Sequence, residues 1–177
     1  MDIDDISFNN FYREDKIVDT DVEWVLDGNR YTIKNIEILN ETLDKKVTLH
    51  CWVNRYKKFG FTIVYNGEKD IVRYDKAVHP PGYKNRCSDS KEGRVQEPHK
   101  HKFKEGCPKS LRIKIIPKDE INPDDVNEAF FQFLNECNIR HEGEYIPVFE
   151  NPMDEQQKLY RYVEKITNHL KQDNNNG

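Results

Sequence analysis

The stretch that decides the fold is FGFTIVYNGEKDIVRYD, residues 59–75. Its centre, Asn66-Gly67, favours a two-residue hairpin turn, because both central positions of that turn need positive φ and these two residues tolerate it. The flanking runs, 59–65 and 70–75, are rich in aromatic and β-branched residues, which is typical of strands. The stretch therefore predicts two antiparallel strands joined by a tight turn.

The hairpin also predicts which side chains face the core. With Asn66-Gly67 as the turn, Gly60 lies opposite Arg73, and alternate residues project from opposite faces. Arg73 and Asp75 then share the polar face, where Gly60 leaves the guanidinium uncovered. The other face is apolar and packs on the core; it carries Phe59, Phe61, Ile63, Val72 and Tyr74.

Other segments extend this hairpin into a larger sheet. Three β-rich runs precede it, at 22–26, 31–39 and 46–56. After it, apolar and basic residues alternate over 111–115, as in a strand with one solvated face. These runs together predict a mostly antiparallel sheet.

Two helix starts follow the last predicted strand. Asn122 has the character of an N-cap and Pro123 that of a first helical residue, and an apolar stripe continues to Cys137 at helical spacing. Asn151-Pro152 opens a second helical pattern in the same way. The predicted fold class is α+β, a mostly antiparallel β-sheet packed against one or two C-terminal helices.

The length of 177 residues suits a single domain, which we assign to residues 1–171. Within this domain the acidic segment 1–20 is expected to be loosely ordered. Residues 172–177 follow the domain as a disordered tail. No apolar run approaches the roughly 18 residues needed to cross a bilayer, and the N-terminus lacks the pattern of a signal peptide. The sequence therefore predicts a cytoplasmic protein with no membrane partner.

Basic residues gather in and just beyond the long polar loop 76–108. The chain carries a net charge of -4, but residues 84–114 hold ten Lys or Arg against four carboxylates. A basic segment on an acidic protein is compatible with an anionic ligand such as RNA, because Lys and Arg neutralise phosphates. The alternative is a solvated loop without a ligand.

Residues able to transfer protons and bind phosphate lie on both sides of this loop. Histidine suits acid and base roles because both its forms are populated near neutrality, and alternate strand positions place His99 and His101 on one face. The first hypothesis is a metal-independent ribonuclease, with one histidine as base on a ribose 2′-hydroxyl and another as acid on the leaving 5′-oxygen. Arg73 and Lys100 or Lys102 would stabilise the phosphorane, and Asp75 would orient an imidazole. The catalytic candidates are Arg73, Asp75, His79, His99 and His101.

A second hypothesis is a zinc site that staples the loop. Cys87, His99, His101 and Cys107 offer two thiolates and two imidazoles, enough for a closed tetrahedral site. The spacing lacks the Cys-x-x-Cys of a zinc finger. A metal held by the histidines would also remove them as free acid and base, so the first two hypotheses exclude each other.

A third hypothesis is a non-catalytic binding module. Lys100 and Lys102, with Tyr83 and Phe103 interleaved, would hold RNA, DNA or an acidic protein, because aromatic side chains among lysines stack on unpaired bases. Such a module keeps its affinity when His99 and His101 are replaced by alanine. A nuclease would instead lose turnover while still binding.

The succession of motifs resembles the TumE-type toxins of bacterial toxin–antitoxin pairs. In that family a Tyr-Asp motif on a strand is followed by His-x-His, an aromatic segment and a helix. Here the corresponding residues are Tyr74-Asp75, then His99 and His101, then a helix with Phe130, Phe131 and Phe133. The resemblance covers about residues 59–138, although the loop here is longer and strands are added before it. It implies a toxin of a bacterial toxin–antitoxin pair, with an antitoxin protein as possible partner. The basic segment separately favours RNA as the ligand.

Overall fold

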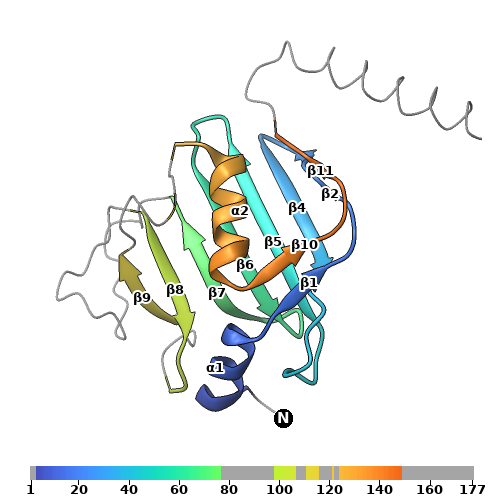
Figure 1. The fold of residues 1–177 in the computed structure, drawn as a ribbon. Coiled ribbons are helices and arrows are strands. Elements are labelled where there is room, and N and C mark those ends of the chain that lie inside the picture. The colour runs from blue at the N-terminus through green and yellow to red at the C-terminus, as the bar shows by residue number, and fades with distance from the viewer. Residues whose placement is uncertain (1–2, 77–97, 107–110, 116–120, 122–123, 149–177) are drawn as a thin grey trace, which may run out of the picture.

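The computed structural model describes residues 3–76, 98–106, 111–115, 121 and 124–148 (Figure 1). Its centre is a seven-stranded antiparallel sheet in which each strand pairs with the next along the chain. The strands, in order across the sheet, are β3 (Val25–Asp27), β4 (Arg30–Glu37), β5 (Val47–Asn54), β6 (Phe59–Tyr65), β7 (Lys69–Asp75), β8 (His99–Phe103) and β9 (Leu111–Ile115).

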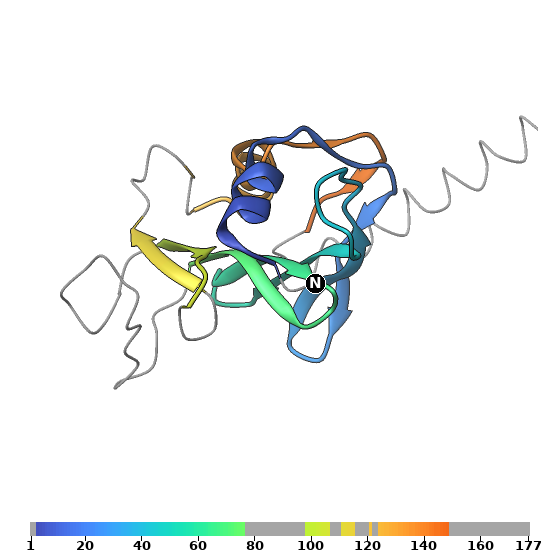
Figure 2. The same cartoon turned by 90° about the horizontal axis from the view of Figure 1, so that it is seen from below.

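Two helices of the described chain, α1 (Asp5–Arg13) and α2 (Val126–Glu136), lie over the same face of this sheet (Figures 1 and 2). The core fills the space between the layers: Phe61 of β6 contacts Phe133 of α2, with ring centroids 5.5 Å apart. Asp125 caps α2 by accepting backbone hydrogen bonds from the first turn. The fold class predicted from the sequence, α+β with a mostly antiparallel sheet, is confirmed.

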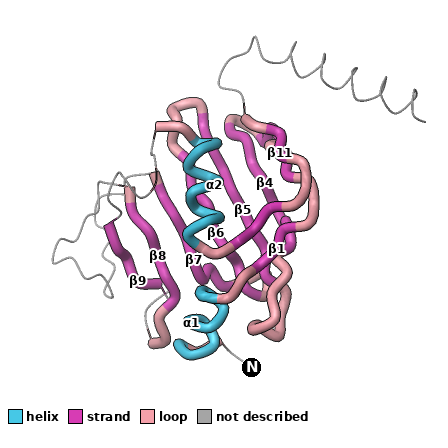
Figure 3. The backbone as a smooth tube through the Cα atoms, in the orientation of Figure 1, coloured by secondary structure: helices cyan, strands magenta, loops and turns pink. Residues whose placement is uncertain are grey.

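Two short parallel pairs join distant parts of the chain. β1 (Lys16–Val18) pairs with β10 (Ile139–His141), and β2 (Val22–Glu23) pairs with β11 (Tyr145–Ile146). Figure 3 shows these strands beside the helix layer. The sequence predicted neither pair, because the strands are only two or three residues long and their partners are remote.

The hairpin of β6 and β7 has the predicted positive φ at Asn66 and Gly67, 55° and 72°, but three residues, 66–68, join its strands instead of two. Tyr65 therefore pairs with Lys69 instead of Glu68, which shifts the register by one position. An irregularity between Ile63 and Val64 shifts it by one more, so that Gly60 lies opposite Asp75 instead of Arg73. Because the shift amounts to two positions, the predicted core face survives unchanged: Phe59, Phe61, Ile63, Val72 and Tyr74 are all buried.

Two other predictions need correction. The N-cap of α2 is Asp125 instead of Asn122, since its carboxylate accepts from the backbone of Asn127 and Glu128. The acidic segment 1–20 is not loosely ordered throughout, because α1 forms within it: Asp4 caps the helix, and its apolar face is buried. The predicted helix after residue 151 and the tail 172–177 lie outside the described residues. None of the helices in the described ranges has the length and apolar character needed to span a membrane.

Candidate active site

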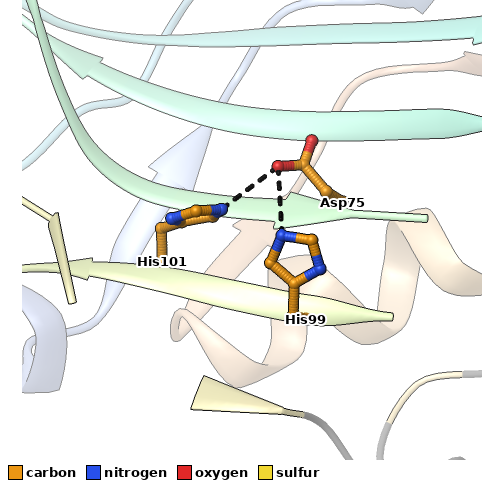
Figure 4. Close-up of side chains that lie close together, drawn as sticks. All are labelled: Asp75, His99 and His101. Atoms are coloured by element: carbon orange, nitrogen blue, oxygen red, sulfur yellow. Dashed lines mark ion pairs between the residues drawn. The ribbon is translucent and has the colours of Figure 1, made fainter. Parts of the chain in front are cut away.

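Strands β7 and β8 lie side by side and bring four of the predicted catalytic residues together. Arg73 lies opposite His101, and Asp75 lies opposite His99. Oδ2 of Asp75 is 3.3 Å from Nε2 of His101 and 3.8 Å from Nε2 of His99 (Figure 4). Arg73 donates a hydrogen bond from Nε to the same Oδ2 at 2.7 Å. We call these four residues the Asp75 cluster.

The cluster is almost closed to solvent, except at Arg73. His99 and His101 expose 0% and 1% of their surface and Asp75 exposes 5%, whereas the side chain of Arg73 is 30% exposed. Burial alone would raise the pKa of Asp75, but its pairing with His101 and the Arg73 guanidinium outweighs burial, and the pKa is lowered. Asp75 is therefore a buried anion that holds two imidazoles and one guanidinium around it.

The cluster projects from the sheet face opposite the helices. Lys100 alternates with His99 and His101 along β8, and it forms an ion pair with Glu136 at the end of α2. Helix α2 lies over one face of the sheet (Figure 2), so Lys100 projects toward that face. His99 and His101 precede and follow Lys100 along the strand and therefore project from the opposite face.

Three of the predicted ligand-binding residues contact residues of the two helices and do not join the cluster. Lys100 is 2% exposed. Nζ of Lys102 lies 3.8 Å from the ring centroid of Tyr12 in α1. Phe103 packs against Phe8 of the same helix, with ring centroids 5.5 Å apart. These side chains tie β8 to the helix layer.

The remaining predicted residues, His79, Tyr83, Cys87 and Cys107, lie outside the described residues. The structure thus places two members of the predicted zinc set, His99 and His101, and neither of its cysteines. It places four of the five catalytic candidates, and all four meet in the Asp75 cluster.

One neighbour of the cluster, Trp52, was not among the predicted site residues. Trp52 of β5 lies opposite Gly60, which in turn lies opposite Asp75. A Cβ atom on Gly60 would stand 2.7 Å from Nε1 of Trp52 and 2.9 Å from Oδ1 of Asp75. Both side chains therefore extend over Gly60. The sequence offered one signal, since Trp52 has the opposite strand parity to the buried Cys51, but its position beside Asp75 depends on the register of three strands.

The cluster also contains the ligand types of a divalent metal centre. One ligand atom each from Asp75, His99 and His101 lies within 4.8 Å of the others. Donor atoms about 2.0–2.1 Å from a tetrahedral ion stand roughly 3.3 Å apart. The 3.3 Å between Asp75 and His101 fits this spacing, and the 3.8 Å to His99 is somewhat wider. This set has Asp75 where the predicted zinc set had two cysteines.

No protein-family model, curated protein or solved structure matches this chain. The resemblance to TumE-type toxins thus stays an expectation from the motifs alone.

Proposed function

We propose that the protein is a ribonuclease that cleaves RNA by histidine acid–base catalysis at the Asp75 cluster. The observation that carries the proposal is that two imidazoles and a guanidinium converge on one carboxylate oxygen, Oδ2 of Asp75. The two imidazole rings are 4.9 Å apart between centroids. Two groups that can exchange protons near neutrality, beside a fixed cation, are what phosphodiester transfer needs.

The roles follow from the distances to the carboxylate. His101, nearer to Asp75 at 3.3 Å, acts as the base, because the anion stabilises the imidazolium that forms. It takes the proton of a ribose 2′-hydroxyl as that oxygen attacks phosphorus. The bond from phosphorus to the 5′-oxygen breaks, and protonated His99 gives its proton to the departing oxygen. The products are a 2′,3′-cyclic phosphate and a 5′-hydroxyl.

Arg73 is the member of the cluster that meets the phosphate first. Its side chain is 30% exposed, while both imidazoles are buried. A guanidinium presents several donors in one plane and stabilises charge that develops on phosphoryl oxygens. The burial of His99 and His101 requires that their surroundings open before a polymer reaches them.

A divalent metal centre is the second candidate, favoured by the close approach of the three ligand atoms of Asp75, His99 and His101. A buried ion needs no route for a polymer, and a site with two imidazoles and a carboxylate suits zinc or Fe(II). The Arg73 guanidinium makes the metal centre the less favourable candidate. An ion about 2 Å from Oδ2 would lie within roughly 5 Å of the guanidinium, at a repulsion of roughly 7 kcal/mol for an effective dielectric constant of about 20.

The test is cleavage of a single-stranded RNA by the full-length protein with and without chelator, together with metal analysis. We expect chelator-resistant cleavage that His101→Ala and His99→Ala abolish, with a cyclic phosphate product. The matched control is His141→Ala, because His141 contacts the backbone of Thr20 and is no part of the cluster. DNA of the same sequence should resist, since it lacks the attacking hydroxyl.

Two results would overturn the proposal in different ways. Stoichiometric zinc or iron that is lost in His101→Ala would favour the metal centre. Equal cleavage by the wild type and both cluster variants would place the activity elsewhere or in a contaminant. In the setting that the sequence resemblance implies, the cleaved RNA would be cytoplasmic and an antitoxin protein would restrain the enzyme.

A further inference from the structure

We infer that Trp52 is the platform on which an unpaired base of the substrate stacks, beside the phosphate held by the Asp75 cluster. The inference rests on the proposed function and specifies its substrate as single-stranded RNA. It depends on where β5, β6 and β7 place Trp52, Gly60 and Asp75 relative to one another.

A single cross-strand row carries these residues. Trp52, Gly60, Asp75 and His99 lie opposite one another on β5, β6, β7 and β8. All members of such a row project from the same face, here the face without the helices (Figures 1 and 2). Neighbouring strands are about 4.8 Å apart, so the backbone of Trp52 lies about 9.5 Å from that of Asp75.

Gly60 allows the Trp52 side chain to reach across this distance. Because it has no side chain, the Trp52 indole extends over the β6 backbone toward Asp75, and the position of a Gly60 Cβ would be 2.7 Å from Nε1 of Trp52. Nε1 of Trp52 and Oδ1 of Asp75 both border that same position. The indole thus forms a wall of the site instead of lying free on the sheet.

The partial exposure of Trp52 suits it to ligand contact. The chain has two tryptophans, and the other, Trp24, is 1% exposed and donates to the Tyr145 hydroxyl at 2.9 Å. Trp52 is only half-buried. A large aromatic surface left partly open beside a cationic, phosphate-binding group is the combination that single-stranded nucleic acids require. Base-paired RNA cannot offer a base for such stacking.

The experiment uses the full-length protein and a short single-stranded oligouridine in which every 2′-hydroxyl is replaced by fluorine, so that no bond can be cleaved and binding is measured without turnover. We expect this RNA to quench the tryptophan fluorescence of the wild type and not that of Trp52→Phe, in which only the buried Trp24 remains. One abasic nucleotide, placed at each position in turn, should at its most sensitive position weaken binding to the wild type about 5- to 150-fold, and binding to Trp52→Ala much less.

A control variant separates stacking from support of the fold. Tyr56→Ala removes an aromatic side chain that is 65% exposed in the turn between β5 and β6, and it should leave affinity unchanged. Trp52→Ala should raise KM with little change in kcat, and Trp52→Phe should restore much of the loss. If Trp52 only supports Asp75, Trp52→Ala will lower kcat instead of raising KM. The abasic nucleotide will then reduce affinity by the same factor in the wild type and in the variant.

The two proposals can fail separately. A wild-type protein that neither binds nor cleaves single-stranded RNA ends the proposed function. A wild type that binds and cleaves with unquenched fluorescence, or with no penalty from an abasic nucleotide at any position, ends the platform while leaving the nuclease intact. Equal affinity for single- and double-stranded RNA would also exclude stacking on Trp52.

Discussion

Gly60→Ala is the substitution that most sharply tests the geometry of the site. The added methyl carbon would lie 2.7 Å from Nε1 of Trp52 and 2.9 Å from Oδ1 of Asp75, whereas ordinary contact begins near 3.4 Å. The two side chains must therefore move apart from the methyl group by about 0.7 and 0.5 Å. The clash involves side chains and no backbone, so the sheet can persist.

The cost in stability should be modest. Overpacking by one methyl group costs about 1–3 kcal/mol, and the lower entropy of alanine in the unfolded chain returns about 0.4–1 kcal/mol. A net loss of about 1–2 kcal/mol corresponds to a fall in Tm of roughly 2–8 °C for a chain of this size. The effect on catalysis should be much larger, because a displacement of about 1 Å at a reacting group can cost roughly 100-fold in rate.

The assay combines thermal unfolding, RNA cleavage and NMR of the indole N–H groups, of which the chain has two. We expect the Trp52 resonance to shift and the Trp24 resonance to stay. Gly28→Ala is the matched control: its φ is +65° and no atom lies within 4 Å, so it costs stability through backbone strain alone. Unshifted Trp52 and undiminished cleavage in Gly60→Ala would refute the described arrangement of Trp52, Gly60 and Asp75.

Four further predictions concern stability. Because the pKa of Asp75 is lowered in the fold, Asp75→Asn should lower the free energy of unfolding by about 1–3 kcal/mol at pH 7. Denaturant titrations should show that this difference from wild type shrinks as the pH falls below about 4 and is lost once Asp75 is protonated in the folded protein. Glu136→Gln should lower the unfolding free energy by roughly 3 kcal/mol, because it leaves the buried Lys100 charge without its anion. Lys100→Met should lose less than Glu136→Gln, since Glu136 still accepts a hydrogen bond from the Tyr12 hydroxyl when Lys100 is replaced; an equal loss in both variants would contradict this asymmetry. Asp125→Ala should remove the N-cap of α2 and lower Tm by about 2–4 °C in calorimetry, and an unchanged Tm would show that the cap contributes nothing.

Local signals in the sequence predicted local structure well. Asn66-Gly67 specified its turn because the need for positive φ acts within two residues. Strand parity correctly put His99 with His101 and Arg73 with Asp75, because side-chain alternation is a property of any strand. The register of the hairpin was not predicted, since three residues instead of two join its strands and an irregularity between Ile63 and Val64 shifts the pairing once more. No residue type at these positions indicates either shift.

Long-range features escaped the sequence analysis because they depend on which elements become neighbours. The burial of Lys100 follows from the arrival of Glu136 at the end of α2, and a lysine in a basic segment is ordinarily solvated. The same holds for Trp52, whose place beside Asp75 requires the pairing of β5, β6 and β7. Helix α1 was missed for another reason: it lies in the acidic segment 1–20, and its two buried residues, Phe8 and Phe11, form only a short apolar pattern.

The parallel pairing of β1 with β10 constrains how the nascent chain folds. Lys16 and Ile139 are register partners with 123 positions between them, so β1 leaves the ribosome about 6–25 s before its partner at synthesis rates of about 5–20 residues per second. During that interval β1 lacks β10, and only the bridge between Ile17 and Leu39 is available to it. Chains that end before residue 139 therefore lack the pairing that joins the two ends of the described fold, and they should unfold more easily than the full-length protein.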